Sequence, residues 1–140
     1  MVISAIRRLM LKLTVPRWRA TLNILKGAID DLFNGPESAV NDAIDRHFGA
    51  TFVQRVNGVW IDRQTFVVGI SELRSVVAQV TVTVLDELVD AGRYAERHII
   101  ELIKHDGERI VQEVYVFARF DADGRFNRIE ETSVAVSDQR

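Results

Sequence analysis

The chain has 140 residues, of which 47% are hydrophobic and 27% are charged, and its formal net charge is −2. This composition is typical of one soluble globular domain, and the small negative charge argues against nucleic-acid binding. The absence of cysteine excludes disulfides, thiolate catalysis and cysteine-based metal sites, and it is consistent with a cytoplasmic protein.

Residues 1–15 form a basic and apolar segment that differs from the rest of the chain. Arg7, Arg8 and Lys12 lie among apolar side chains at helical spacing. Lys12 interrupts the apolar run and no small-residue cleavage site follows, so the segment is a poor signal peptide, and it is too short to cross a membrane. We expect an amphipathic helical extension that packs on its own domain or on a partner subunit, ahead of one domain over residues 16–140. The alternative that we favour less is contact with a membrane surface.

Helical periodicity dominates the first half of the chain. Apolar spacing predicts a helix over Pro16–Asn34, with Gly35 directly after its end. A second, shorter helix is predicted over about Pro36–Phe48, and Gly49 stops it. The segment 51–56 then alternates as a short strand.

A hairpin and a third helix follow. Asn57-Gly58 is a strong signal for a tight turn between the short strand and Val59–Ile61. Asp62 suits the N-cap of a helix. The core face of that helix is marked by apolar side chains at spacings of three and four, namely Phe66, Ile70, Leu73 and Val77.

From Val80 the apolar period changes from about 3.6 to 2, which indicates strands. The segment 80–84 alternates as one strand. Long strands are then predicted at about 94–104, 109–120 and 125–136, separated by short turns that contain both Gly and Asp. Short turns between neighbours indicate an antiparallel meander. Helices followed by a meander predict an α+β fold, a cone-like barrel with three helices packed in a curved, mostly antiparallel sheet.

Four segments carry a resemblance to a known family. They are Asp30–Gly35, Phe48–Phe52, Ile70–Arg74, and the stretch from Phe117–Phe120 through Asp123–Arg125 to Ile129–Glu131. With the order of elements, they resemble the nuclear transport factor two-like, or SnoaL-like, superfamily over about Trp18 to Val136. That group includes polyketide cyclases, ketosteroid isomerases, limonene epoxide hydrolases and scytalone dehydratases. It holds enzymes and non-enzymes, so the resemblance implies a fold rather than a reaction.

The catalytic residues of ketosteroid isomerases have no counterpart here. The tyrosine and the acid that hold the oxyanion in that family match Ile29 and Val116, and its general base matches Gln54. None of these three side chains can do the corresponding work. The resemblance therefore implies a chemistry other than steroid isomerisation by that route.

Limonene epoxide hydrolases are matched in part. Their middle-strand Arg-x-Asp resembles Glu96–Ile99, with Arg97 on the arginine, Ile99 in place of the acid and Glu101 two residues beyond. The other counterparts are Glu131, near the last-strand acid, and Phe52 and Gln54, near the first-strand tyrosine and asparagine that help hold the water.

Strand alternation leaves two assignments of the pocket face open. In the first, Arg97 points inward with Ala95, Ile99 and Glu101, joined by Gln112, Val114, Val116, Ala118, Ile129, Glu131 and Ser133. In the second, His98 points inward with Tyr94, Glu96, Ile100 and Leu102, joined by Tyr115 and Phe117. Either choice encloses an apolar pocket with a few polar groups, which is typical of a small-molecule site.

The candidate catalytic residues are Arg97, His98, Glu101 and Glu131. Arg97 could pair with either glutamate, which would stay ionised and serve as a base, and histidine is a good general base near neutral pH. The candidate ligand-binding residues are Phe52, Gln54, Trp60, Val114, Tyr115, Val116 and Ile129. The plainer alternatives are structural ion pairs, a hydrogen-bonded structural histidine, and packing of Trp60 at a hairpin or interface.

Three classes of function stay open. The first is an enzyme with acid–base chemistry of the lyase, isomerase or hydrolase type on a small apolar molecule. The second is a ligand-binding module without catalysis, and the third is a protein–protein module with a filled pocket. The three scattered histidines show no metal-ligand spacing, so we expect neither metal nor cofactor. The resemblance also implies a homodimer formed through the sheet, for which Thr81 and Thr83 suit the outer face.

Overall fold

A computed structural model describes residues 22–137 of the protein. The extension predicted over residues 1–15 and the start of the first predicted helix lie outside this range. The described elements are, in chain order, α2 (Ile24–Phe33), the 3₁₀ turn η2 (Glu37–Ala39), α3 (Val40–His47), β1 (Phe48–Val56), β2 (Val59–Asp62), α4 (Arg63–Val76), β3 (Val77–Asp90), β4 (Arg93–Lys104), β5 (Arg109–Phe120) and β6 (Phe126–Ala135). None of the helices in residues 22–137 is long and apolar enough to cross a membrane.

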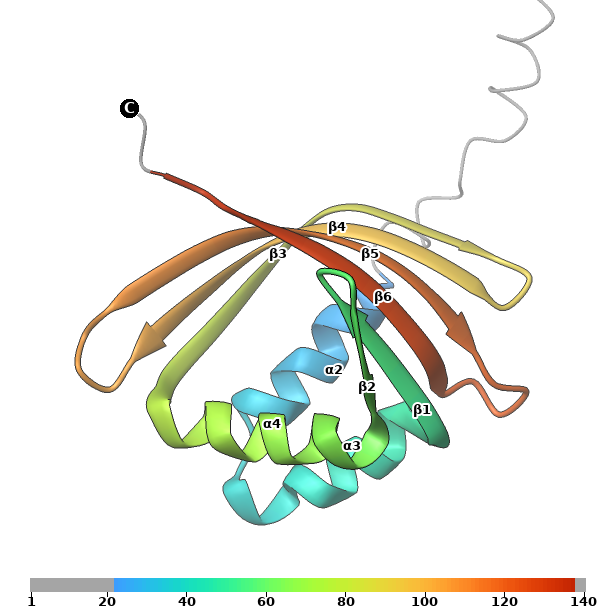
Figure 1. Ribbon diagram of the computed structural model, residues 1–140, viewed down its shortest axis with the longest axis horizontal. Coiled ribbons are helices and arrows are strands. Elements are labelled where there is room, and N and C mark those ends of the chain that lie inside the picture. Colours follow the sequence, from blue (N-terminus) through green and yellow to red (C-terminus); the bar gives the residue numbers. More distant parts are fainter. Residues whose placement is uncertain (1–21, 138–140) are drawn as a thin grey trace, which may run out of the picture.

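The strands form one curved sheet that arches over the helices (Figure 1). Their order is β2-β1-β6-β5-β4-β3, and every pairing is antiparallel except that of β1 with β6, which is parallel. The α+β fold with helices in a curved, mostly antiparallel sheet is therefore confirmed. The sheet stays open, because β2 and β3 are edges and do not pair with each other.

Local signals account for most of the element boundaries. The Asp62 side chain accepts a hydrogen bond of 2.8 Å from the Thr65 amide and so caps α4, as predicted. Asn57 and Gly58 both adopt positive φ, 47° and 90°, which a tight turn between β1 and β2 requires. Asn34 ends α2, and its side-chain amide donates 2.9 Å to the Val80 carbonyl, which fastens the helix to β3.

The junction of α3 and β1 differs from the prediction. The predicted helix to Phe48 is split into η2 and α3, and it ends at His47, because Phe48 is already extended and belongs to β1. Its ring packs against Phe52 and Phe66 with centroids 4.9 and 4.8 Å apart. Gly49 does not stop a helix. It makes room for the β5–β6 turn, since a Cβ there would lie 2.3 Å from an oxygen of Asp121.

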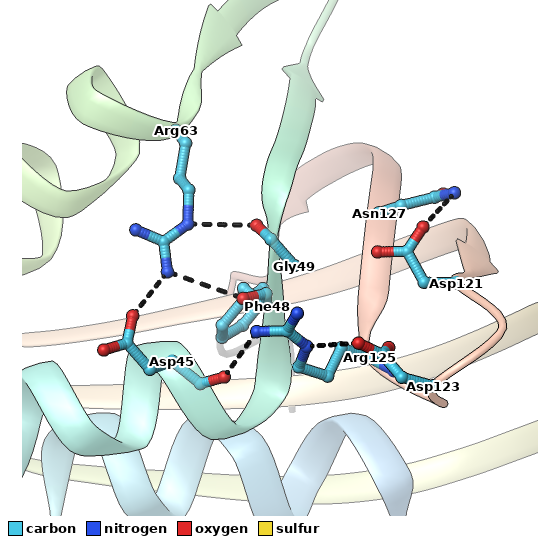
Figure 2. Close-up of polar contacts among 8 residues, drawn as sticks. All are labelled: Asp45, Phe48, Gly49, Arg63, Asp121, Asp123, Arg125 and Asn127. Carbon is cyan, nitrogen blue, oxygen red and sulfur yellow. Dashed lines mark hydrogen bonds and ion pairs between the residues drawn. The ribbon is translucent and has the colours of Figure 1, made fainter.

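A group of hydrogen bonds holds this junction to its neighbours (Figure 2). Arg63 at the start of α4 donates to the Gly49 carbonyl at 3.0 Å and to the Asp45 carboxylate at 2.8 Å. Arg125 from the β5–β6 turn donates to the Asp45 carbonyl at 3.1 Å and to Asp123 at 2.9 Å. Helices α3 and α4, strand β1 and the β5–β6 turn are thereby joined at one end of the sheet.

Candidate functional site

The register of the sheet decides which side chains face the helices. His98 on β4 lies opposite Val114 on β5, and Val114 lies opposite Ser133 on β6. Because directly opposed residues share a face, the inner face carries Tyr94, Glu96, His98, Ile100 and Leu102 of β4, Gln112, Val114, Val116 and Ala118 of β5, and Ile129, Glu131 and Ser133 of β6.

Each of the two assignments from the sequence mixes the two faces. The first had the correct residues of β5 and β6 but the wrong set of β4, because Arg97 faces Tyr115 on the outer side. The second had the correct set of β4 but added Tyr115 and Phe117, which are exposed on the outer side. Alternation fixes the faces within one strand. Relating two strands also requires the register of the turn, and a shift of one residue there exchanges the faces.

A cavity of about 310 Å³ lies between the inner face and helices α2 and α4. Its volume is at the low end of the range of small-molecule sites. Most of its lining is apolar, including Leu25, Ile29, Leu32 and Phe33 of α2, and Phe66, Ile70 and Leu73 of α4. The polar side chains that residues 22–137 contribute to the lining are Gln54, Thr65, His98, Gln112, Glu131 and Ser133, and none of these residues is a lysine or an arginine.

His98 and Glu96 form a buried pair beside the cavity. Their side chains are 2% and 0% exposed, and Nδ1 of His98 hydrogen-bonds to a carboxylate oxygen of Glu96. Nδ1 therefore carries the proton, and in a neutral imidazole Nε2 is an acceptor. Nε2 has no hydrogen-bond partner within residues 22–137, while His98 lines the cavity. This atom is available to a molecule in the cavity.

Tyr94 and Glu87 extend the hydrogen-bond network of the His98–Glu96 pair toward β3 and α2. The Tyr94 hydroxyl donates 2.6 Å to Glu87, lies 3.2 Å from the second oxygen of Glu96, and accepts the Leu25 amide at 3.3 Å. Burial, followed by the hydrogen bond to Glu87, raises the pKa of Tyr94, so the hydroxyl stays protonated. The Glu87 carboxylate also accepts the amides of Asn23 and Ile24 at 2.9 Å each, at the N-terminus of α2.

Glu131 is the second ionisable group of the lining. One of its oxygens accepts 2.8 Å from the Gln54 amide of β1. Burial raises the pKa of Glu131, and the charge of Glu96 raises it further, against the opposite effects of His98 and Gln54. Glu131 and His98 lie on strands separated by β5, so the two strands are ~10 Å apart. The cavity thus has a proton acceptor, His98, on β4 and a carboxyl group, Glu131, on β6.

Three predicted site residues lie on the outer face instead. Arg97 pairs with Asp86 at 2.8 Å and with Glu113 at 3.1 Å, and Tyr115 donates 2.9 Å to that same glutamate. Glu101 pairs with Arg109 at 2.7 Å. The expected pairing of Arg97 with Glu131 or Glu101 does not form, because the register turns Arg97 away from the cavity and the two glutamates have other partners.

The predicted ligand-binding residues divide between cavity, core and surface. Gln54, Val114 and Ile129 line the cavity. Phe52 and Val116 are buried in the core, with 1% and 2% exposure. Trp60 is 48% exposed and stacks on Arg128, with the guanidinium carbon 4.8 Å from the ring centroid, rather than on the cavity.

Sequence reasoning did not assign the supporting roles of Glu87, Tyr94 and Glu96, nor the cavity position of Thr65. One signal was present. Tyr94, Glu96 and His98 are polar residues at period two in a strand whose remaining inner positions are Ile100 and Leu102. Polar side chains on the buried face of a strand need partners, so this pattern favours a hydrogen-bonded network.

A curved sheet around helices with an internal pocket defines a class of cone-shaped α+β proteins, and solved structures match it. They include a nuclear transport factor two-like protein from Exiguobacterium sp. 255-15 of unknown function (TM-score 0.61, 16% identity, 79% of this chain and 98% of that one). IdmH from Streptomyces antibioticus, a proposed polyketide cyclase, matches with TM-score 0.60 and 16% identity over 77% and 90% of the two chains. A proposed isomerase of the SnoaL-like family from Agrobacterium tumefaciens matches with TM-score 0.59 and 11% identity over 81% and 96%.

No family model and no curated protein matches the sequence. The fold is nevertheless that of the nuclear transport factor two-like superfamily, as the resemblance implied. Identities this low show the fold and leave the chemistry to the site.

Proposed function

We propose that the protein binds a small, largely apolar molecule in the cavity and catalyses a proton transfer on it, in a reaction of the lyase, isomerase or hydrolase type. The observation that carries the proposal is His98, which is buried, oriented through Nδ1 by Glu96 and unpartnered at Nε2 beside an apolar cavity. A base held in this way is what general acid–base catalysis requires.

Each polar group has a role in this proposal. Nε2 of His98 takes a proton from the substrate or from a water molecule, and the proton then resides on the imidazole. Glu96 stabilises the imidazolium that forms and fixes the orientation of the ring. Glu131, held by Gln54, binds the polar group of the substrate on β6, across β5 from His98. A proposed cyclase and a proposed isomerase share this fold, so the proposed chemistry is compatible with the fold.

The test begins with a screen of small apolar ketones, epoxides, alcohols and amines, by thermal shift for binding and by mass spectrometry for turnover. Turnover of any ligand found should fall ~100-fold or more in His98→Gln, the typical contribution of a general base. His105→Gln is the matched control, because His105 is exposed in the β4–β5 turn. Equal turnover by the two variants would show that His98 is not the base.

A ligand-binding module without catalysis is the second candidate. It is favoured by the predominantly apolar lining, in which His98 and Glu131 are the only titratable side chains among the residues that the structure describes. Ligands that bind the wild-type protein and are never converted would support it.

We also propose a homodimer formed through the outer face of the sheet. This face exposes the large apolar side chains Leu88, Tyr115, Phe117 and Val134. Exposed apolar clusters of this kind mark interaction surfaces. We also propose a cytoplasmic location, with which the lack of cysteine is consistent.

A further inference from the structure

Building on the proposed function, we infer that the ligand of the cavity carries a basic nitrogen, which Glu131 holds as an ammonium group. This narrows the substrate class from a small apolar molecule to an apolar amine.

Among residues 22–137, the lining of the cavity contains one carboxyl group, that of Glu131, and no arginine or lysine. Glu87 lies opposite Glu96, and Glu96 lies opposite Val116, which in turn lies opposite Glu131, so one row across four strands carries three glutamates on the inner face. Among the described residues of the lining, His98 is the one side chain that can become positive. Like charges placed this close oppose each other, and burial strengthens the effect.

The partners of each glutamate show which one lacks a positive charge. Glu87 has two backbone amides at the N-terminus of α2 and the Tyr94 hydroxyl, while Glu96 has His98. Glu131 has only the neutral amide of Gln54, and its second oxygen has no hydrogen-bond partner within residues 22–137.

An ammonium group supplies what Glu131 lacks. It would donate a charge-assisted hydrogen bond to the unpartnered oxygen and neutralise the carboxylate. Phe33, Phe48 and Phe66 belong to the same lining, and aromatic faces attract cations. A carboxylate or phosphate would instead add a negative charge beside Glu131 and Glu96, where the part of the lining that the structure describes has no arginine or lysine to balance it.

The position of the nitrogen also orients the rest of the ligand. Glu131 and His98 stand on either side of β5. A nitrogen on Glu131 therefore directs the adjoining carbon atoms of the ligand across Val114 toward Nε2 of His98, the proposed base.

Three probes with one skeleton test the inference on the full-length protein, namely benzylamine, benzyl alcohol and benzoate, compared by calorimetry. We expect benzylamine to bind ~10-fold or more tightly than benzyl alcohol, in line with one charge-assisted hydrogen bond, and benzoate to bind most weakly. Glu131→Gln should remove the preference for the amine and leave the alcohol unchanged. The control is Glu130→Gln, the next residue along the strand, which pairs with Arg55 and Arg128 on the outer face.

The pH dependence gives a second readout that needs no variant. The groups that face Glu131 are Gln54 from β1 and His98 and Glu96 from β4, with Glu87 and Tyr94 behind them, and α2 and α4 contribute no titratable side chain to the lining. Benzylamine should bind more tightly as the pH rises and Glu131 loses its proton, while benzyl alcohol should not respond in this way.

Benzyl alcohol or benzoate binding as tightly as benzylamine in the wild-type protein would overturn the inference, as would an amine preference that survives in Glu131→Gln. The proposed catalysis fails separately. Selective amine binding without any turnover would support the amine site and contradict the enzyme, whereas turnover of neutral compounds without amine selectivity would do the reverse.

Discussion

Glu131 is the residue whose ionisation matters most for the cavity. Its surroundings raise its pKa, first through burial and then through the charge of Glu96, so the folded state binds the proton more tightly than the unfolded state does. For a carboxyl group with a raised pKa, the contribution to stability is complete below the unfolded pKa and is lost as the pH rises through the folded pKa.

Glu131→Gln should therefore become stabilising relative to wild type as the pH increases. The glutamine keeps an oxygen for the Gln54 amide and has no proton to lose. From about pH 4 to about pH 8, the difference in the free energy of unfolding should shift steadily in favour of the variant. Urea denaturation across that range measures it. Parallel pH profiles for the two proteins would mean that Glu131 does not have the raised pKa.

Gly49 is a residue whose missing side chain matters. Gly49→Ala places a Cβ 2.3 Å from Oδ2 of Asp121, so that carboxylate must turn, which disturbs the 3.0 Å hydrogen bond that its Oδ1 accepts from Asn127. We expect a loss of ~1 kcal/mol in the free energy of unfolding, about that of one hydrogen bond, because the obstacle is the end of a side chain rather than backbone. Gly27→Ala in α2 is the control, because nothing lies within 4 Å of its new Cβ.

A double variant separates this contact from other causes. Asp121→Ala removes the obstacle, so Gly49→Ala should cost less in that background than in the wild type. An undiminished cost there would place the strain elsewhere, for example at the Phe126 carbonyl, 3.5 Å from the built Cβ.

At the scale of the elements, β3 and β4 are coupled to the first turn of α2 through Tyr94. Its hydroxyl joins Glu87, Glu96 and the Leu25 amide. Tyr94→Phe would leave the buried amide without its acceptor and remove the donor to Glu87, and unsatisfied buried groups cost ~1–3 kcal/mol. Denaturation should show that loss, and hydrogen exchange should show faster exchange at Leu25.

The matched control is Tyr115→Phe on the outer face, where the hydroxyl of this exposed residue donates to the carboxylate of Glu113. Its cost should stay within ~0.5 kcal/mol, as for most surface changes. If both variants lose the same stability, Tyr94 does not link the helix to the sheet.

The elements were predictable where the signals are local. The Asp62 cap, the Asn57-Gly58 turn and the period-two strands each depend on residues close in sequence, and the structure contains all three. The end of α3 was not predictable, because Phe48 extends to pack on Phe66 and Gly49 accommodates a turn 72 residues away, at Asp121.

The candidate site was predictable only in part for the same reason. His98 and Glu131 were identifiable as ionisable residues in apolar strands, but which of their neighbours share the cavity depends on the β4–β5 register. Arg97 was chosen because it matches the arginine of the Arg-x-Asp segment in limonene epoxide hydrolases. It lies one residue from His98, and in a strand that spacing places it on the other face.

At the scale of the whole molecule, the two faces of the sheet have different surroundings. The inner face covers the cavity and the helices, whereas the outer face leaves Phe117 72% and Leu88 63% exposed. The outer face also carries both charge signs, for example Arg97 and Glu113. A surface that combines exposed apolar side chains with charges of both signs can pack against the same surface of a second copy, related by a two-fold axis.

Phe117→Glu should therefore dissociate the proposed homodimer. A carboxylate at the centre of a two-fold interface would be buried without a partner, close to its own symmetry mate, and such a change typically weakens association by several kcal/mol. Sedimentation velocity should show a dimer for the wild type and a monomer for the variant.

Val68→Glu is the control, since Val68 is a 50% exposed apolar residue of α4, and this helix lies against the inner face. The control variant should leave the dimer intact. A wild type that sediments as a monomer at every concentration would contradict the proposed dimer, and dissociation by Val68→Glu alone would move the interface to the helices.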